Sequence, residues 1–424
     1  MDTNIGAKER VTQNRLIGLF KNVLKYTYLG NWETREDNAN IEEKLLTAYL
    51  SRRGYTDKEI RSSIVKLKQS ANSLGGGLYN ANKEVYTFLR YGVNIQAEVT
   101  EKKKMVHLID WANPMENDFQ IAEEVTIQGA SDRRPDLVVY VNGIALAVIE
   151  LKRSTVSAHE GIRQNIRNQQ DGYIPRFFTT IQLLFAGNDT EGLHYGVIKT
   201  PEKFWLRWKE PCGEPCQPSH FTAKEYPNEL DRSVLQFFEP VRLLEYIHDF
   251  IIFDGGIKKT ARPNQYFAVK AAQPRVRKKQ NGIIWHSQGS GKSLTMVWLA
   301  QWIRENVSDA RVVIITDRDE LDKQIESGFK DVGEQIQRAK SGGKLIEMLN
   351  AAEPWLICTL IHKFGNKNDS DAISVGNKKA SKSLDLYLEE LAKSLPADFC
   401  AKGNIYVFID ECLSLIHISE PTRH

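Results

Sequence analysis

The stretch RRPDLVVYVNGIALAVIELKR, residues 133–153, places two β-rich runs on either side of Asn142-Gly143. This dipeptide accepts the positive φ angles of a type I′ turn, so the stretch predicts a β-hairpin. Asp136 and Glu150 then lie at the same end of the hairpin. Glu150 and Lys152 are two residues apart on one strand and therefore share a face. The hairpin thus gathers two carboxylates and a lysine.

The spacing of the two acids around the turn raises a question of register. With a strict two-residue loop Asp136 faces Ile149, so Asp136 and Glu150 point to opposite sides of the sheet. Pro135 cannot join a ladder, so either the strand begins only at Leu137 and frees Asp136, or a bulge shifts the register. We therefore predict an irregularity in this hairpin.

The chemistry of these three groups points to a metal-dependent site. Two carboxylates can hold a hard cation such as Mg²⁺, and a lysine can orient or activate a water for in-line attack on a phosphodiester. The alternative is a surface hairpin with a solvated acid at each base. The neighbouring elements decide between the two.

The first half of the chain combines helices with short strands. Apolar residues at helical spacing predict amphipathic helices over 9–27 and 40–72. Between about 121 and 199 a polar helical stretch at 157–171 interrupts β-rich runs, which indicates an α/β core. These runs are VTIQG, DLVVYV, IALAVIEL, IQLLFAG and HYGVIK. Gly, Pro and basic residues at 253–265 predict a linker, so we place the domain boundary between 255 and 256.

The second half contains the segment GIIWHSQGSGKSLTMVWLAQWI, residues 282–303, which predicts a strand, a Gly-rich turn and a helix. Its turn suits a nucleotide phosphate, because Gly289, Ser290 and Gly291 present backbone N–H groups, Lys292 reaches the β and γ phosphates, and Ser293 ligates Mg²⁺. It departs from GxxxxGK[ST] at the first glycine, which His286 replaces. The alternative is a Gly-rich turn without a ligand.

The strand NIYVFI delivers Asp410 and Glu411 at the far end of the chain. Asp410 would join the Mg²⁺ shell, and Glu411 would polarise the attacking water. Apolar strands alternate with helical stretches in this half, which predicts a parallel sheet built from βα units. These strands are GIIW, RVVIIT, WLICTL and NIYVFI. Together they predict an ATP site.

The amino-acid composition restricts the possible partners and functions only weakly. The 424 residues are 41% hydrophobic and 26% charged, with a net charge of +3, which excludes neither nucleic acid nor other partners. Five cysteines suit a reducing compartment, and no run approaches the roughly 18 apolar residues of a membrane span, so we expect a cytoplasmic protein. Cys212 and Cys216, with His220 nearby, are either loop thiols or a zinc site that lacks a second ligand pair.

The hairpin segment resembles the PD-(D/E)xK nuclease signature, with Pro135-Asp136 as PD and Glu150-Leu151-Lys152 as ExK. Gln169 and Tyr173 match the QxxxY element of a subset of those nucleases. The resemblance implies that Asp136, Glu150, Lys152, Gln169 and Tyr173 are catalytic, with Asp136 and Glu150 as metal ligands. Three basic side chains, which track DNA phosphates or are merely solvated, are Arg153, Arg163 and Arg167.

The second half resembles superfamily 2 helicases. Thr316-Asp317-Arg318 and 359–364 are placed like their DNA-contacting motifs, and Gln265 like the glutamine that reads adenine. For each of these segments the alternative is a core strand with a polar exit loop.

A PD-(D/E)xK nuclease followed by such a motor resembles the R subunit of type I restriction-modification enzymes. The resemblance implies an α/β chain with a restriction-endonuclease-like domain over 1–255 and a partial RecA-like P-loop lobe over 256–412. It also implies ATP, Mg²⁺, double-stranded DNA, and methyltransferase and specificity subunits as partners. Type III restriction subunits carry the nuclease after the motor. The alternatives are a repair-type helicase-nuclease acting on DNA ends, and a non-enzymatic remnant.

The last residues form a separate case. LSLIHISEPTR, 413–423, resembles the in-frame translation of a sequencing adapter, and Leu413 stands where the family has histidine. We therefore expect 413–424 to be a non-native tail, with a natural apolar strand as the alternative. Without a second motor lobe, we expect weak nucleotide binding, no translocation and an exposed sheet edge.

Overall fold

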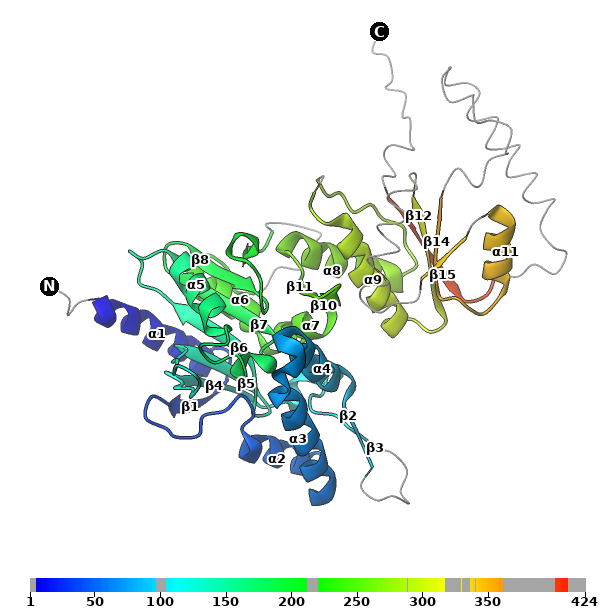
Figure 1. The fold of residues 1–424 in the computed structure, drawn as a ribbon. Coiled ribbons are helices and arrows are strands. Elements are labelled where there is room, and N and C mark those ends of the chain that lie inside the picture. Colours follow the sequence, from blue (N-terminus) through cyan, green and yellow to red (C-terminus); the bar gives the residue numbers. More distant parts are fainter. Residues whose placement is uncertain are drawn as a thin grey trace, which may run out of the picture. The chain divides into compact units, whose positions relative to one another are not determined.

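The computed structural model describes residues 5–96, 104–211, 220–287, 289–316, 329, 336–339, 341–360 and 401–410 (Figure 1). The chain divides into two compact units, Met1–Phe267 and Ala268–His424. This division lies twelve residues beyond the predicted boundary between 255 and 256. The domain limits remain a prediction, and each unit is described by itself.

The first unit alternates helices with a mixed sheet. Its helices are α1 (Ile5–Asn22), α2 (Glu43–Arg52), α3 (Asp57–Asn72), α4 (Gly77–Tyr91), α5 (Ala158–Asn168), α6 (Glu229–Phe238), α7 (Pro240–Asp249) and the start of α8 (Pro263–Arg277). Its strands are β1 (Thr27–Asn31), β2 (Val93–Ile95), β3 (Lys104–Val106), β4 (Phe119–Glu123), β5 (Leu137–Val141), β6 (Ile144–Leu151), β7 (Leu183–Asn188), β8 (Gly192–Gly196), β9 (Leu206–Arg207), β10 (Ile251–Asp254) and β11 (Ile257–Thr260).

Seven of these strands form one sheet in the order β1-β4-β5-β6-β7-β8-β9. The pairs β1–β4 and β6–β7 are parallel, and the others are antiparallel. Ile162 of α5 packs into the apolar cluster on one face, while Phe238 of α6 lies against Phe185 of β7 and Phe20 of α1. Helices on both faces explain why β5 and β6 are buried along their whole length.

The central hairpin of this sheet confirms the predicted turn and the predicted irregularity. Asn142 and Gly143 have φ angles of 54° and 79°, as a type I′ turn requires. Val139 pairs with Ala147 but Tyr140 pairs with Ala145, so the ladder contains a bulge. The bulge accommodates one extra residue in β6 and shifts the register by one. As a result, the position opposite Asp136 is Glu150 rather than Ile149.

Three elements of the first unit differ from the expectation. The predicted helix over 40–72 is two helices, because Gly54 adopts a φ of 84° and Thr56 caps α3 with a capping box. The predicted helix over 9–27 ends at Asn22, and Thr27 already begins β1. The run VTIQG forms no strand; Ile127 makes an isolated bridge with Arg133, and the Val125 N–H donates to the Pro135 carbonyl.

The predicted linker over 253–265 is also corrected. Gly255 and Gly256, with φ angles of 52° and 91°, join β10 and β11 in an antiparallel hairpin. Lys258 of this hairpin is buried, and its Nζ lies 2.7 Å from both Asn82 Oδ1 and Gln182 Oε1. Contacts with residues distant in sequence therefore hold the segment in the first unit.

We expect Lys258 to make the stability of the first unit depend on pH. Burial lowers the pKa of Lys258 well below its ordinary value. Between that lowered pKa and about 10.4 the unfolded chain binds the extra proton, so the free energy of unfolding rises with pH, by up to ~1.4 kcal/mol per pH unit. Urea unfolding of the wild type from pH 7 to 10 should show this rise, and Lys258→Met should lack it. Equal slopes in the two proteins would contradict the lowered pKa of Lys258.

The second unit is a P-loop-like α/β layer. Its described elements are α9 (Lys292–Asn306), β12 (Ala310–Thr316), β13 (Gln337–Arg338), α11 (Gly342–Asn350), β14 (Leu356–Leu360) and β15 (Asn404–Ile409). The strands are all parallel, in the order β13-β14-β12-β15. This confirms the predicted parallel sheet.

The predicted strand GIIW is wrong for this structure. Residues 281–287 form no strand, and Ile283 and Trp285 are 67% and 79% exposed. An apolar run becomes a strand only where a neighbouring strand accepts its backbone hydrogen bonds, and no described strand pairs with this one. In the described sheet β15 lies at an edge, with Val407 and Ile409 about half exposed.

Among the described residues, none of the helices combines the length and the apolar character that crossing a membrane requires.

Candidate active site

The two acids of the hairpin lie side by side at the end of β5 and β6. Asp136 precedes the pair Leu137–Ile149, so the next position opposite it is Glu150. The Asp136 Oδ2 atom accepts a hydrogen bond of 2.6 Å from the backbone N–H of Leu151. Glu150 is fully buried, and in the described part of the chain no donor reaches either of its carboxylate oxygens. A proton shared with Asp136, or a bound cation, would satisfy them.

The electrostatics of the pair reflect this burial. Desolvation raises the pKa of Asp136 to about 6, against the opposing effect of the Lys152 ammonium. Desolvation, followed by the neighbouring Asp136, raises the pKa of Glu150 well above its ordinary value. A divalent cation would remove the cost of holding both groups ionised. The donor set therefore fits a hard cation such as Mg²⁺.

Lys152 completes the group and directly follows Leu151, the last residue of β6. Its Nζ donates to the Leu151 carbonyl at 2.7 Å and lies 3.3 Å from Oε1 of Glu9 on α1. Burial alone would lower the pKa of Lys152, but the carboxylates of Asp136, Glu150 and Glu9 raise it overall. The lysine is therefore a cation held beside the acidic pair.

Helix α5 covers this part of the sheet. A Cβ atom added at Gly161 would lie 3.3 Å from the Glu150 Cβ and 3.1 Å from the Ala186 Cβ. The glycine thus permits a close helix–strand approach, which excludes water from Glu150. Of the predicted DNA-contacting arginines, Arg163 already pairs with Glu160 and Glu202.

The structure does not join Gln169 and Tyr173 to the acidic pair by a hydrogen bond. Gln169 Nε2 donates to the Asn165 carbonyl, and Gln169 Oε1 accepts from the backbone N–H of Lys199. Tyr173 lies under the guanidinium of Arg133, 4.1 Å from the ring centroid. Their catalytic role remains a prediction.

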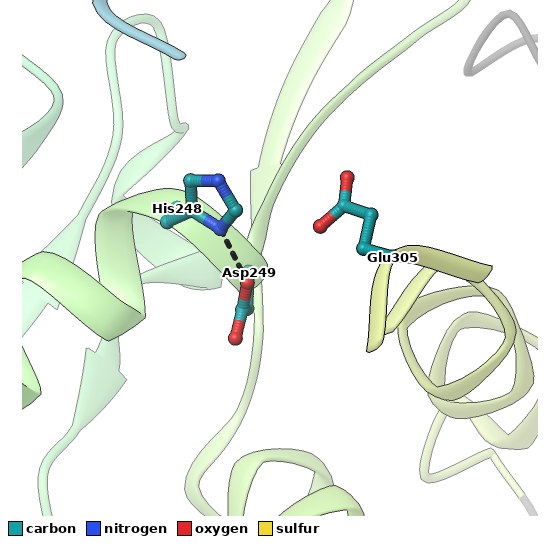
Figure 2. Close-up of side chains that lie close together, drawn as sticks. All are labelled: His248, Asp249 and Glu305. Carbon is teal, nitrogen blue, oxygen red and sulfur yellow. Dashed lines mark hydrogen bonds and ion pairs between the residues drawn. The ribbon is translucent and has the colours of Figure 1, made fainter. Parts of the chain in front are cut away.

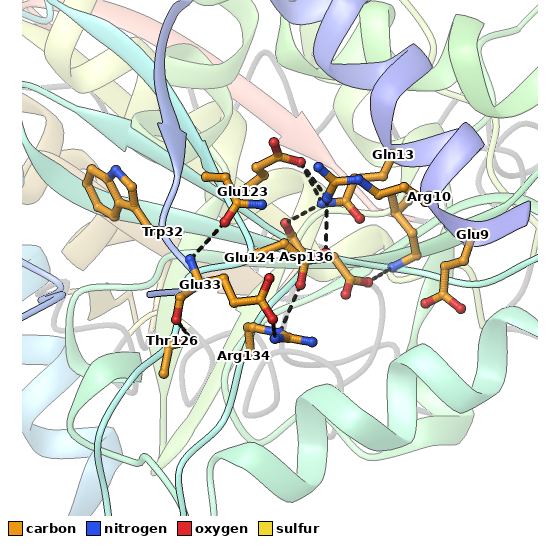
Figure 3. Close-up of polar contacts among 12 residues, drawn as sticks. Glu9, Arg10, Gln13, Trp32, Glu33, Glu123, Glu124, Thr126, Arg134 and Asp136 are labelled. Carbon is orange, nitrogen blue, oxygen red and sulfur yellow. Dashed lines mark hydrogen bonds and ion pairs between the residues drawn. The ribbon is translucent and has the colours of Figure 1, made fainter. Parts of the chain in front are cut away.

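A polar network on α1 was not predicted from the sequence (Figure 3). Gln13 Nε2 donates to Glu123 Oε2 at 2.9 Å and to the Asp136 carbonyl at 3.4 Å. Arg10 forms ion pairs with Glu123 and Glu124 at 2.8 and 3.3 Å. Glu9 and Gln13 are four residues apart and therefore lie on one helix face. This spacing was the available signal, but it does not say which strand that face meets.

The phosphate loop precedes α9 in the second unit. Gly289 and Gly291 have φ angles of 75° and 87°, which only glycine adopts without strain. Ser290 Oγ and its backbone N–H both donate to the Ser287 carbonyl, which closes the turn. Lys292 and Ser293 are the first two residues of α9, so the loop leads into a helix N-terminus that suits an anion.

The other predicted nucleotide residues are placed as follows. Asp410 is buried directly after β15, and its backbone N–H donates to the Ile315 carbonyl. Thr316 and Thr359 are buried in β12 and β14. Gln265 is buried in α8, and its Oε1 accepts from the backbone N–H of Arg262. The residues outside the described part of the chain include Glu411, 317–318, 361–364 and the tail 413–424.

We assign no function to two further clusters of polar side chains. His248 Nδ1 and Asp249 Oδ1 lie 2.6 Å apart at the end of α7 (Figure 2), where a histidine favourably meets the helix C-terminus. His220 packs on Phe221, while Cys212 and Cys216 lie outside the described residues. The zinc alternative therefore stays a prediction.

Family models match both halves of the chain. Residues 7–203 match the type I restriction enzyme R protein N terminus, and residues 264–414 match the SWI2/SNF2 ATPase. The first match contains Asp136, Glu150 and Lys152, and the second contains the phosphate loop and Asp410.

Curated relatives agree with these matches. A protein of Methanocaldococcus jannaschii, named as a type I restriction enzyme endonuclease subunit, is 27% identical over 86% of this chain and 38% of its own length. One of Staphylococcus saprophyticus, with the same kind of name, is 26% identical over 66% of this chain and 30% of its own length. The chain thus spans less than two fifths of the length of these relatives.

Proposed function

We propose that this chain, which is related over most of its length to the endonuclease subunits of type I restriction enzymes, supplies the DNA-cutting site and part of the ATP-driven motor of such an enzyme. The observation that carries the proposal is the convergence of Asp136, Glu150 and Lys152 at one end of the β5–β6 hairpin. The order of the two matched segments, nuclease before motor, agrees with it.

The residues of the hairpin have distinct tasks in this proposal. Asp136 and Glu150 would hold Mg²⁺, which when bound supplies Lewis-acid stabilisation of a phosphodiester and a lowered pKa of its water. Lys152 orients the attacking water and offsets charge that develops on the phosphate. Gln169 and Tyr173 would take part in catalysis, and this role rests on the QxxxY resemblance alone. The buried position of Glu150 excludes bulk water from one side of the pair.

The second unit supplies the nucleotide site in this proposal. Gly289, Ser290, Gly291, Lys292 and Ser293 would bind the phosphates of ATP, with Ser293 and Asp410 holding its Mg²⁺. Glu411 would polarise the attacking water, and Gln265 would read the adenine. The positive φ angles of Gly289 and Gly291 support the phosphate loop.

The substrate and partners follow from the same relationship. We propose double-stranded DNA as the substrate, the methyltransferase and specificity subunits of one restriction system as partners, and the cytoplasm as the compartment. Recognition of a DNA sequence would lie with the specificity subunit, because the groups assigned to the hairpin site, two metal-binding carboxylates and a lysine, act on the phosphodiester rather than on the bases.

Plasmid cleavage tests the proposal. The chain, alone and with the methyltransferase and specificity subunits, is incubated with closed circular DNA and Mg²⁺. We expect nicked or linear products that EDTA prevents and that Asp136→Asn does not form, since the metal-binding pair is then incomplete. Absence of metal-dependent products in both mixtures would reject it. Degradation of linear DNA alone, from its ends, would favour the repair-type helicase-nuclease instead.

A further inference from the structure

Helix α1 is fixed against the strand ends that carry the acidic pair (Figure 3). Gln13 bonds both the Glu123 carboxylate and the Asp136 carbonyl, and Arg10 pairs with Glu123 at 2.8 Å. Glu123 and Gln13 are both buried, so the bond between their side chains is shielded from solvent. One turn earlier, the same face of α1 presents Glu9 to the site.

Glu9 contacts the site through an ion pair with Lys152. Its Oε1 lies 3.3 Å from Nζ of Lys152, and the two side chains are 27% and 15% exposed. Lys152 also donates to the Leu151 carbonyl, so its ammonium has one main-chain acceptor from the sheet and one carboxylate from α1. We propose that Glu9 is a positioning residue for Lys152, and that seating of α1 is thereby a condition of nuclease activity.

A role as a third metal ligand is less consistent with the geometry. Among the described residues, Glu9 belongs to no group of three acidic, histidine or cysteine side chains whose ligand atoms lie within 4.8 Å of one another. Its specific contact is the ion pair. The lysine side chain is flexible and can adopt many rotamers. A fixed ion-pair partner restricts it to those that place the ammonium beside the acidic pair.

The charge balance of a loaded site supports the same role. A divalent cation offsets the two negative charges of Asp136 and Glu150. Glu9 is then the nearby carboxylate whose negative charge is not offset by the metal ion and can still pair with the Lys152 ammonium. Since Glu9 reaches the lysine from a separate element, movement of α1 would change the lysine's position and would also release the Gln13 contact with the Asp136 carbonyl.

The test compares Glu9→Gln with a matched control, Glu36→Gln, which removes an exposed carboxylate from the loop before α2. We expect Glu9→Gln to lower the single-turnover cleavage rate about 10–100-fold, as a misplaced catalytic group does, and Glu36→Gln to leave it unchanged. Combined with Lys152→Ala, Glu9→Gln should cause no further loss, because the two residues act as one unit. An additive loss would overturn the inference.

A second readout separates positioning from ligation. Binding of Ca²⁺ without DNA, followed by calorimetry, should change less than about threefold in Glu9→Gln if the glutamate only positions the lysine, and at least about tenfold if it is a ligand. The second result would overturn the inference. The inference rests on the proposed nuclease function: cleavage that survives Lys152→Ala rejects that function, whereas cleavage lost in Lys152→Ala but kept in Glu9→Gln rejects only the inference.

Discussion

Glu150→Gln should abolish DNA cleavage and at the same time stabilise the metal-free protein. Cleavage is expected to fall at least ~10³-fold, which corresponds to about 4 kcal/mol of transition-state stabilisation. The loss follows because an amide cannot replace the second carboxylate of the metal-binding pair. Single-turnover cleavage of closed circular plasmid measures it.

The gain in stability has a separate cause. Glu150 is fully buried, its oxygens have no donor in the described structure, and burial raises its pKa well above the ordinary value. A group whose pKa is raised in the folded state costs stability as pH rises above its unfolded pKa. The glutamine is neutral and can donate to the Asp136 carboxylate, so the free energy of unfolding in EDTA at pH 7 should rise by about 1–3 kcal/mol.

The matched control is Glu84→Gln, an exposed position on α4, which should change neither quantity. Cleavage within about tenfold of the wild type in Glu150→Gln would remove Glu150 from the catalytic group. Cleavage lost without a gain in stability would mean that the pair is not strained in the metal-free protein.

The acidic pair could be derived from the sequence because its determinants are local. Asn142-Gly143 fixes the turn, and counting residues on either side shows that the acids can meet only if the ladder is irregular. The bulge between Val139 and Tyr140 has that effect. The turn, the irregularity and the strand limits therefore all follow from one short segment.

The role of α1 could not be derived in the same way. Glu9 lies far in sequence from Lys152, and a helical face shows only that it packs, not against which strand. The prediction of a linker over 253–265 was wrong for a similar reason. Gly-Gly with basic residues is typical of a linker and also of a hairpin turn, and here the buried contacts of Lys258 with Asn82 and Gln182 decide for the hairpin.

Gly143→Ala should strongly destabilise the first unit. Gly143 has a φ of 79°, and an added Cβ would lie 2.7 Å from the Leu45 Cβ, 2.8 Å from the Glu42 carbonyl oxygen and 2.9 Å from the Leu46 nitrogen. Left-handed strain and the clash with the start of α2 together should cost about 3 kcal/mol or more. In a unit of this size the melting temperature should fall by roughly 6–12 °C.

The turn has little freedom to relax this clash. Asn142 is fully buried, and its side chain bonds the Leu108 carbonyl, Asn117 Oδ1 and the Asp118 backbone N–H. The Gly143 carbonyl accepts from the Glu42 backbone N–H at 2.8 Å. Both turn residues are thus held by hydrogen bonds, so the turn cannot relax by moving into solvent. The substitution should therefore distort the hairpin itself.

Gly172→Ala is the matched control, since this exposed glycine has no positive φ and nothing within 4 Å of an added Cβ. It should leave stability unchanged or raise it by about 0.4–1 kcal/mol, because alanine restricts the unfolded chain. Thermal unfolding followed by circular dichroism compares the two variants. If Gly143→Ala melts like Gly172→Ala, the turn is not left-handed, and the register that sets Asp136 opposite Glu150 must have another origin.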